Sequence, residues 1–323
     1  MKGLPTTRAA QLAPPGASDE PWLIEGLWSA QAVGIVGGEP KCGKSFLALD
    51  LAVSVASRTP CLRHFPTRER GPVLLFAAED APHIVRQRLH GIAHAAGVDF
   101  PSLDVHVITA PTLRLDRPEH QQRLEATVAR LRPKLLVLDP LVRLHCIDEN
   151  LVAEVAPLLA YLRRLQRHYH TAVALVHHAR KGAAHERGGQ ALRGSSDLHA
   201  WGDSNLYLRR HGQQLHLSIE HRAAPGTDRL ALTLRASAPA LALELIDHPP
   251  AEPLDQTPFQ PSALQRIERI LAETTTPVSQ RQLREAARMR TSHVAEILTT
   301  LIANGRVSRS AEGYRLNRSS GPS

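Results

Sequence analysis

With 323 residues, 42% of them hydrophobic and 22% charged, the chain is long enough for two domains, and fibrous or disordered proteins are excluded. No apolar run reaches transmembrane length and residues 1–5 lack the apolar core of a signal peptide, so we expect no membrane partner. Three cysteines without metal-ligand spacing indicate a reducing, cytoplasmic location.

The net charge of +8 favours a polyanionic partner, with nucleic acid first. An arginine-rich composition inherited from a GC-rich genome would produce the same charge, so this alternative stays open. Residues 1–20 are rich in proline, alanine and glycine and predict a loose N-terminal arm. The first apolar segment, residues 21–28, brings Trp22 and Trp28, for which packing in the core is favoured over flanking a ligand.

Apolar runs then alternate with helical patterns. Buried strands are predicted at residues 33–37, 73–77, 105–108, 135–138 and 172–176, and helices at residues 44–57, 82–96, 119–131 and 151–168. Repeated strand–helix units predict an α/β fold, a parallel sheet with helices on both faces. Antiparallel strands added at the sheet edge are predicted at residues 205–208, 215–219, 230–234 and 241–245.

A proline-rich stretch at residues 248–261 predicts a stiff linker, which ends a first domain over residues 21–247. Beyond it, helical patterns and two short strands occur at residues 262–273, 278–289, 291–304, 306–309 and 314–316, with Ser279 as a helix cap. Three helices followed by a hairpin predict a winged helix-turn-helix domain over residues 262–318.

The most informative motif lies between the first strand and the first helix of this alternation. It reads Gly38-Glu39-Pro40-Lys41-Cys42-Gly43-Lys44-Ser45-Phe46 and fits the phosphate-binding loop. The two glycines let backbone N–H groups converge on one point, where the start of the next helix adds positive potential. Lys44 is expected to reach the β- and γ-phosphates of ATP, and the Ser45 hydroxyl to bind Mg²⁺. The same potential would lower the pKa of Cys42; a small filler at a variable position is the favoured alternative.

Polar residues follow three of the other predicted strands. Asp139 is expected to hold Mg²⁺ or one of its waters, in preference to a strand-end cap. Glu79 is expected to polarise the water that attacks the γ-phosphate, with Asp80 as the cap of the next helix. His178 follows His177, and one of them is expected to hydrogen-bond the γ-phosphate. A metal site made by both is disfavoured, since neighbouring strand residues point to opposite faces.

These motifs together resemble the RecA-like hexameric ATPases of the plasmid RepA-type replicative helicase group, an AAA family ATPase. The matching stretches are residues 38–45, 77–80, 136–139, 175–184 and 193–196 with Asp203. The resemblance covers about residues 20–245 and implies a RecA-like P-loop NTPase core. It also implies a homo-hexameric ring around single-stranded DNA, Glu79 as catalytic base, Asp139 on Mg²⁺ and His178 as γ-phosphate sensor. A polar loop at residues 181–192 would line the channel.

Two departures from the family bear on function. Where the family places its arginine finger, three residues after Asp203, this chain has Leu206. Arg209 and Arg210 are the nearest substitutes, with Arg193 as a further candidate.

The appended C-terminal domain is the second departure. Its arginines and histidine favour contact with duplex DNA, while docking of a protein partner is the alternative; they are Arg281, Arg284, Arg288, Arg290, His293, Arg306, Arg309 and Arg315. Two functions therefore remain: a replicative helicase of a plasmid or mobile element, or an ATP-dependent DNA-binding regulator or replication initiator without unwinding activity. A recombinase-like filament is a weaker third.

Overall fold

The computed structural model describes residues 4–11, 21–178, 196–211, 214–246, 263–274, 276–287, 289, 291–304, 306–310 and 312–317. The chain divides into two compact units, Met1–Pro249 and Pro250–Ser323. The predicted linker, the loop at residues 181–192, and Arg193, Arg288 and Arg290 lie outside the described residues. Within the described part, none of the helices is both long and apolar enough to cross a membrane.

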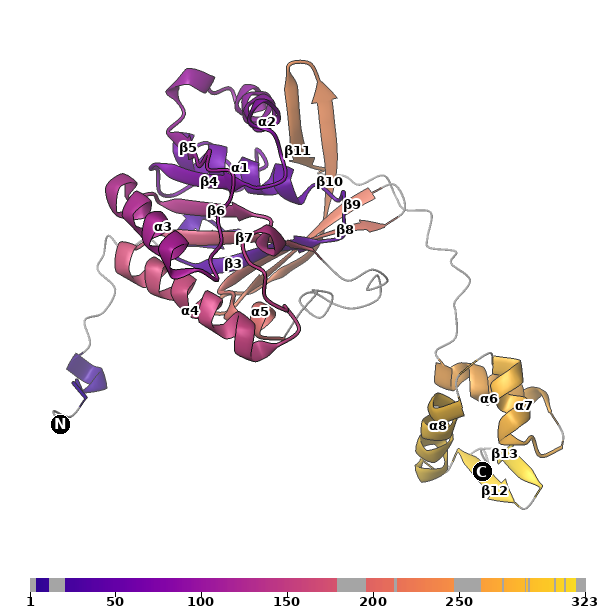
Figure 1. The fold of residues 1–323 in the computed structure, drawn as a ribbon. Helices are drawn as coiled ribbons and strands as arrows, with labels where there is room; N and C mark the ends of the chain where they lie inside the picture. Colours follow the sequence, from indigo (N-terminus) through magenta and orange to yellow (C-terminus); the bar gives the residue numbers. More distant parts are fainter. Residues whose placement is uncertain are drawn as a thin grey trace. The chain divides into compact units, whose positions relative to one another are not determined.

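The first unit is built on a nine-stranded sheet with the order β11-β10-β9-β8-β3-β7-β6-β4-β5 (Figure 1). Its strands are β3 (Val33–Gly38), β4 (Val73–Ala77), β5 (Val105–Val107), β6 (Leu135–Asp139), β7 (Ala172–His178), β8 (Ser204–His211), β9 (Gln214–His221), β10 (Thr227–Ser237) and β11 (Ala240–Leu245). The six strands from β8 to β5 are parallel. Strands β9, β10 and β11 continue the sheet antiparallel to their neighbours.

The predicted parallel sheet with an antiparallel extension is confirmed, with one correction. Strand β8, which we expected to be antiparallel, runs parallel to β3. The chain reaches β8 from β7 through a crossover that contains α5 (Ser196–Trp201). A crossover of this kind is what joins two parallel strands of one sheet. The antiparallel part of the sheet therefore begins one strand later, at β9.

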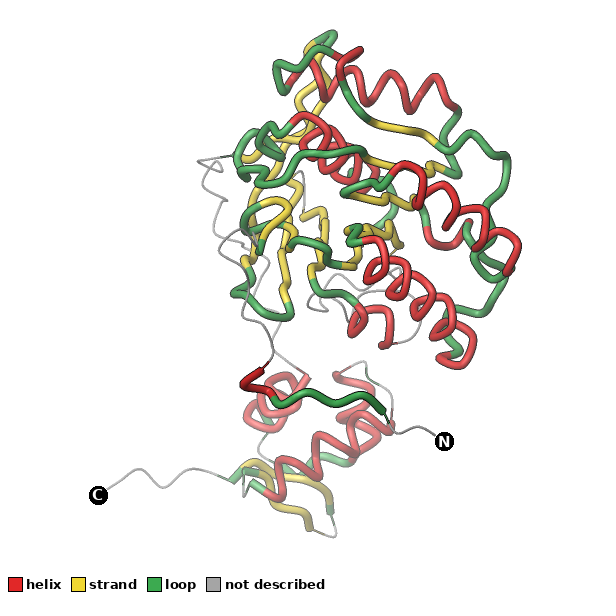
Figure 2. The backbone as a smooth tube through the Cα atoms, turned by 90° about the vertical axis from the view of Figure 1, so that its left-hand side faces the viewer, coloured by secondary structure: helices red, strands yellow, loops and turns green. Residues whose placement is uncertain are grey.

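Helices cover both faces of the sheet (Figures 1 and 2). One face carries α1 (Lys44–Ser57) and α2 (Pro82–Ala95), and the other carries α3 (Pro118–Leu131), α4 (Val152–Tyr169) and α5. Two separate apolar cores result because strand side chains alternate between faces. On β3, Val36 belongs to the core under α1, whereas Ile35 belongs to the core under α4. The α/β prediction is thereby confirmed.

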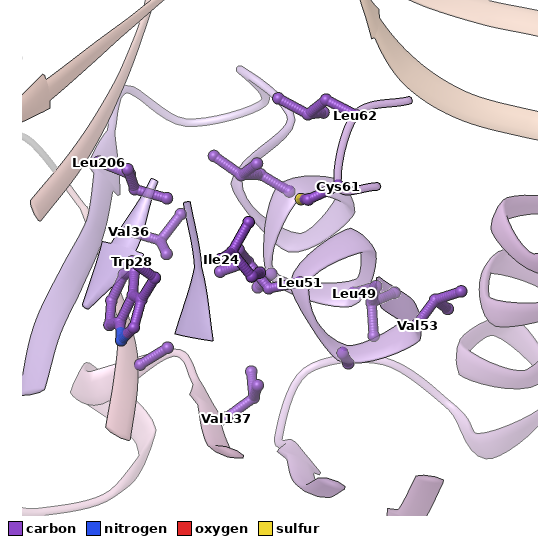
Figure 3. Close-up of a cluster of buried hydrophobic side chains, with 14 of the residues drawn as sticks. Ile24, Trp28, Val36, Leu49, Leu51, Val53, Cys61, Leu62, Val137 and Leu206 are labelled. Atoms are coloured by element: carbon purple, nitrogen blue, oxygen red, sulfur yellow. The ribbon is translucent and has the colours of Figure 1, made fainter. Parts of the chain in front are cut away.

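A short two-stranded sheet, β1 (Trp22–Ile24) with β2 (Trp28–Ser29), lies at the start of the unit. Trp28 is fully buried in the core that also contains Val36 and Leu206 (Figure 3). Packing of Trp28 in the core is therefore confirmed. Leu206 is 0% exposed. An arginine at that position would bury its guanidinium in this core without water, at a cost of several kcal/mol, so the packing of β8 explains the leucine.

The backbones of β3 and β8 approach each other at a glycine. A Cβ atom on Gly34 would lie 1.6 Å from the backbone oxygen of Ser204. The two strands could separate only by breaking the packing of the sheet centre, since cores at native density resist added volume.

We expect Gly34→Ala to lower the free energy of unfolding by about 3 kcal/mol or more, measured by chemical or thermal unfolding. Gly97→Asn is the matched control. Gly97 has a φ of 68° and a Cβ there would meet nothing within 4 Å, and asparagine tolerates positive φ. We expect this control to cost less than about 1 kcal/mol; an equally small loss for Gly34→Ala would contradict the close approach of the two backbones.

The second unit contains α6 (Ala263–Glu273), α7 (Gln280–Ala287), α8 (Thr291–Ala303), β12 (Val307–Ser310) and β13 (Gly313–Leu316). These elements share an apolar core of their own, which includes Ile267, Leu283 and Leu298. Ser279 acts as the predicted cap: the backbone N–H of Gln282 donates to its Oγ at 3.3 Å, and its own N–H donates to the Gln282 side chain at 2.9 Å. This reciprocal pair is a capping box.

Candidate nucleotide-binding site

The predicted phosphate loop forms a tight turn between β3 and α1. Gly38, Lys41 and Gly43 have positive φ values of 153°, 63° and 89°. At Gly38 a Cβ would lie 2.3 Å from the backbone oxygen of Leu208, so only glycine fits. Helix α1 begins after Gly43 without a side-chain cap. The first N–H groups of a helix have no partner within the helix and carry partial positive charge, so the turn is suited to an anion.

Lys44 adds a full positive charge to the loop. Its side chain is only 5% exposed, and its Nζ donates to the backbone oxygen of Glu39 at 2.6 Å. Burial lowers the pKa of Lys44, while the nearby Cys42 and Asp139 raise it. A desolvated ammonium group gains most from a close anionic partner. The position and charge of Lys44 therefore fit binding of a phosphate.

Asp139 is the last residue of β6 and lies beside the end of β4, opposite Ala77. It is 8% exposed and its carboxylate is hydrogen-bonded by the Ser45 side chain. Burial raises the pKa of Asp139 from 3.8 to about 6; the Ser45 hydrogen bond lowers it and the charge of Asp80 raises it. The parallel register thus brings the carboxylate to the phosphate loop.

Ser45 and Asp139 offer the oxygen ligands that Mg²⁺ prefers. Among the described residues there is no group of three or more His, Cys, Asp or Glu side chains arranged to hold a metal ion. Mg²⁺ is usually held through one or two protein oxygens together with substrate phosphates and waters. The donor set therefore fits a magnesium ion that arrives with a nucleotide.

Two more carboxylates follow β4. Glu79 is 44% exposed, and its Oε1 accepts from Arg143 Nε at 2.8 Å. Asp80 pairs with Arg88 of α2, whose guanidinium lies 5.2 Å from the centre of the Phe46 ring. Helix α2 starts after Ala81 and has no side-chain cap, so the prediction that Asp80 caps it is wrong. A charge-assisted bond to a guanidinium is stronger than a bond to a neutral backbone N–H.

The two histidines at the end of β7 point to opposite faces, as the strand alternation predicts. His178 lines the same pocket as Lys44 and Asp139. His177 is 1% exposed, and its Nε2 lies 4.0 Å from Glu149 Oε2. Only His178 is therefore placed to touch a phosphate.

Arg210 and Arg209 lie within β8 rather than after it. Arg210 lines the pocket of its own chain. Arg209 follows Tyr207 on the opposite face of the sheet, because residues two apart on a strand share a face. Asp203, at the other end of β8, accepts from the backbone N–H of Val33 at 3.3 Å and pairs with Arg163, so it stabilises the start of two strands far from the pocket.

The phosphate loop and the side chains that converge on it surround one pocket of about 340 Å³. Its lining includes Lys41, Cys42, Gly43, Lys44, Ser45, Phe46, Glu79, Asp80, Asp139, His178 and Arg210. Gly38, Glu39 and Pro40 complete the loop behind it. The opposite wall is apolar and comes from the antiparallel extension, through Leu215, Leu234 and Leu243. The size suits a small polar ligand with an apolar part.

Cys42 is the small buried filler that the sequence favoured. It is 1% exposed, and burial raises the pKa of its thiol, although the charge of Lys44 lowers it. The less favoured alternative, a thiol pKa lowered by the loop's positive potential, is wrong because loss of water outweighs that potential. A buried thiol of this kind is a filler rather than a reactive group.

Three features of the site were not found from the sequence: Arg143, Arg88 and the leucine wall. Arg143 lies four residues after Asp139, a spacing that carries no known signal, and its partner Glu79 lies 64 residues away. The sequence pattern of the leucines is that of ordinary strand residues. Only the tertiary arrangement of the antiparallel strands brings them to the phosphate loop.

Comparison with known proteins agrees with this geometry. A family model described as an AAA domain matches residues 4–184, more than half of the chain. A solved structure titled "ATPase Domain of G40P" is similar with a TM-score of 0.51 at 14% identity, over 66% of this chain and 84% of that chain; at this identity the likeness concerns the fold alone. Arg209, Arg210 and the second unit lie beyond the family match. The chain belongs to the AAA domain family and is an ATPase of the P-loop type.

Proposed function

We propose that this protein is an ATP-hydrolysing motor that acts on DNA, a replicative helicase of a plasmid or mobile element in the cytoplasm. The observation that carries the proposal is the convergence of Lys44, Ser45, Glu79, Asp139 and His178 on one pocket. A binding module needs only the phosphate loop. A water-activating carboxylate and a γ-phosphate contact are parts of a hydrolysis site.

Each residue then has a defined task. The loop amides and Lys44 bind the phosphates and offset negative charge as the bond between the β- and γ-phosphates breaks. Glu79 accepts a proton from the water that attacks the γ-phosphorus, and ADP departs with the bridging oxygen. Mg²⁺, held by Ser45 and Asp139, would neutralise charge on the phosphate oxygens.

His178 reaches the pocket from β7 and Arg210 from β8, the two strands that flank β3. His178 would hydrogen-bond the γ-phosphate and respond to its loss at the end of β7. Arg210 would contact the nucleotide bound to its own chain. An arginine from a neighbouring subunit would complete the site, and Arg209, on the other face of β8, is the substitute that this chain offers.

The proposed assembly is a homo-hexameric ring that encircles single-stranded DNA. The fold of the first unit, the likeness to the ATPase domain of G40P and the chain's net charge of +8 support this assembly. The segment at residues 181–192 follows β7 in the sequence, so the strand that carries His178 would connect ATP hydrolysis with the DNA channel.

Unwinding of a tailed DNA duplex tests the motor. We expect strand separation that requires ATP and Mg²⁺, together with ATPase activity that single-stranded DNA stimulates. Oligomer mass with and without nucleotide tests the ring. A protein that hydrolyses ATP but separates no strands, on substrates with either 3′ or 5′ tails, would exclude the helicase.

The second unit favours one alternative, a DNA-binding regulator or replication initiator. Its three helices and hairpin form a separate core, and the hairpin exposes Arg309 and Arg315. A winged helix-turn-helix of this kind would place α8 in a major groove and the hairpin on phosphates. Two results together would support this alternative. The wild type would bind duplex DNA sequence-specifically without unwinding it, and Arg309→Ala and Arg315→Ala would lose this binding.

Mixing of variant and wild-type subunits tests the arginines. Because Arg210 lines its own pocket, we expect Arg210→Ala subunits to lower ATP hydrolysis in proportion to their share of the mixture. Arg209→Ala subunits, if Arg209 reaches a neighbour, should lower it more steeply than their share. The measurement is ATPase rate against mixing ratio. Disproportionate inhibition by Arg210→Ala would contradict its assignment to the pocket of its own chain.

A further inference from the structure

A largely buried carboxylate outside the pocket joins two of the elements that form the pocket. Glu149 lies in the segment between β6 and α4, and its side chain is 14% exposed. Its Oε1 lies 3.2 Å from His145 Nε2, and its Oε2 lies 4.0 Å from His177 Nε2. The two histidine side chains are 4% and 2% exposed. One carboxylate thus faces two imidazoles, one oxygen to each.

The His145 end of this cluster is fixed in place. The backbone oxygen of His145 accepts from Arg114 Nη1 at 2.6 Å, and the preceding Leu144 oxygen accepts from the Leu115 N–H at 2.6 Å. The imidazole of His145 therefore belongs to a rigid segment. Through Glu149, that rigidity extends to the side chain of His177.

His177 in turn sets the position of His178. The two residues are neighbours on β7 and point to opposite faces of the sheet, so a rotation of the strand end moves both side chains. β7 ends at His178, and the last paired residues with β3 are His178 and Gly38. The strand end is therefore anchored on one edge by the phosphate loop strand and on the far face by Glu149.

Packing alone does not explain this carboxylate. Burial of a carboxylate between two imidazoles costs several kcal/mol of desolvation, and apolar side chains of similar volume often stabilise such sites more. The same face of the sheet is otherwise filled by an apolar core that includes Leu138, Leu141 and Leu144. By contrast, the carboxylate is hydrogen-bonded to the His145 ring at 3.2 Å and contacts the His177 ring at 4.0 Å, so it restrains both imidazoles.

We propose that Glu149 is a positioning residue for ATP hydrolysis: it holds His177, and thereby presents His178 to the γ-phosphate. The inference rests on the proposed role of His178. It assigns to the segment after Asp139 a second task, which is to connect the metal-binding end of β6 with the phosphate-sensing end of β7.

The first test measures kcat and KM for ATP in three variants of Glu149. Glu149→Ala is expected to lower kcat by about tenfold or more, since misplacement of a contact group by about 1 Å costs up to about 100-fold. The KM for ATP should change by less than about threefold, because the phosphate loop is intact. Glu149→Gln keeps an oxygen and an amide for the two rings and should restore most of the rate. Glu149→Asp, which shortens the side chain, should fall between them and serves if the alanine variant does not fold.

Glu154→Gln is the matched control. Glu154 lies nearby, in the first turn of α4, is exposed, and accepts from the backbone N–H of Asp148 at 2.8 Å. We expect its kcat to stay within about twofold of the wild type, the usual range for an exposed polar contact. An equal loss of kcat in Glu154→Gln and Glu149→Ala would show that the segment needs only general support, and would overturn the proposal.

The Glu149→Ala substitution made in the His178→Ala variant separates this inference from the proposed function. His178→Ala alone should lower kcat by about 100-fold, as removal of one transition-state contact does. In that background, Glu149→Ala should cost less than about twofold more, because the group that it positions is gone. Full wild-type kcat in His178→Ala would remove the sensor role and the inference with it. Two other outcomes would overturn the inference alone. In the first, His178→Ala lowers kcat but Glu149→Ala does not. In the second, Glu149→Ala lowers kcat by the same factor in the wild type and in His178→Ala.

Discussion

Glu79→Gln is expected to lower kcat for ATP hydrolysis by about 10²- to 10⁴-fold, the usual contribution of a general base. Glutamine has nearly the same shape but cannot accept the proton that the attacking water loses. ATP binding should be retained, because the phosphate loop and Lys44 are unchanged. Phosphate release measures the first effect, and equilibrium binding of a fluorescent ATP analogue measures the second.

Glu69→Gln provides the comparison for this variant. Glu69 precedes β4 as Glu79 follows it, and its carboxylate also pairs with a cation, Lys134. It lies away from the pocket lining, so its loss should leave kcat within about twofold, as for other partly exposed ion pairs. If Glu79→Gln keeps its turnover, the base lies elsewhere, and Asp80, the other carboxylate in the pocket that follows β4, becomes the first candidate.

Asp139→Asn is expected to change activity and stability in opposite directions. Loss of the carboxylate should remove Mg²⁺-dependent hydrolysis, with a fall in kcat of about 10²-fold or more. The ligand-free protein should become more stable at pH 7.5, because the variant no longer buries an ionised group beside Glu79 and Asp80. Thermal unfolding without nucleotide and calorimetric titration of Mg²⁺ with ATP measure the two effects separately.

The sign of the stability change follows from the raised pKa of Asp139. Between pH 3.8 and about 6 the folded protein binds the proton more tightly than the unfolded chain, so stability falls as pH rises through this window. Above about pH 6 the cost of the buried charge is fully present. The gain in Asp139→Asn should therefore reach at most about 3 kcal/mol near pH 7.5 and disappear below about pH 4.

Asp148→Asn tests whether this gain belongs to the site. Asp148 is exposed, and hydrogen bonds from Asn150 lower the pKa of its carboxyl. Folding therefore favours its charged form. At pH values above the usual pKa of the carboxyl, the variant should lose a little stability rather than gain it. A gain of stability in both variants would point to net charge, and no gain in Asp139→Asn would contradict the burial of its charge.

Several conclusions depended on short stretches of sequence. The phosphate loop needs glycines at fixed spacing between a strand and a helix, and all of its parts lie within nine consecutive residues. Asp139, Glu79 and His178 could be placed at one edge because parallel strands of one sheet end on the same side. The domain organisation, the winged helix and the roles of these residues stay predictions that the proposed experiments test.

Other features depended on contacts between distant parts of the chain. Arg143 with Glu79, Arg88 with Phe46, and Glu149 with His177 involve long flexible side chains, whose partners no local pattern specifies. The helix cap expected at Asp80 was wrong for the same reason, because Arg88 from the next turns of α2 binds its carboxylate.

The sequence alone thus determined the nucleotide chemistry, since a phosphate site is made by local backbone geometry that glycine spacing reveals. It also determined the layered α/β fold, because burial and alternation follow directly from apolar periodicity. Only the tertiary structure decided which arginine enters the pocket. The parallel register of β8 with β3 places Leu206 in the core and Arg210 at the phosphate loop, and strand register depends on the packing of the whole sheet.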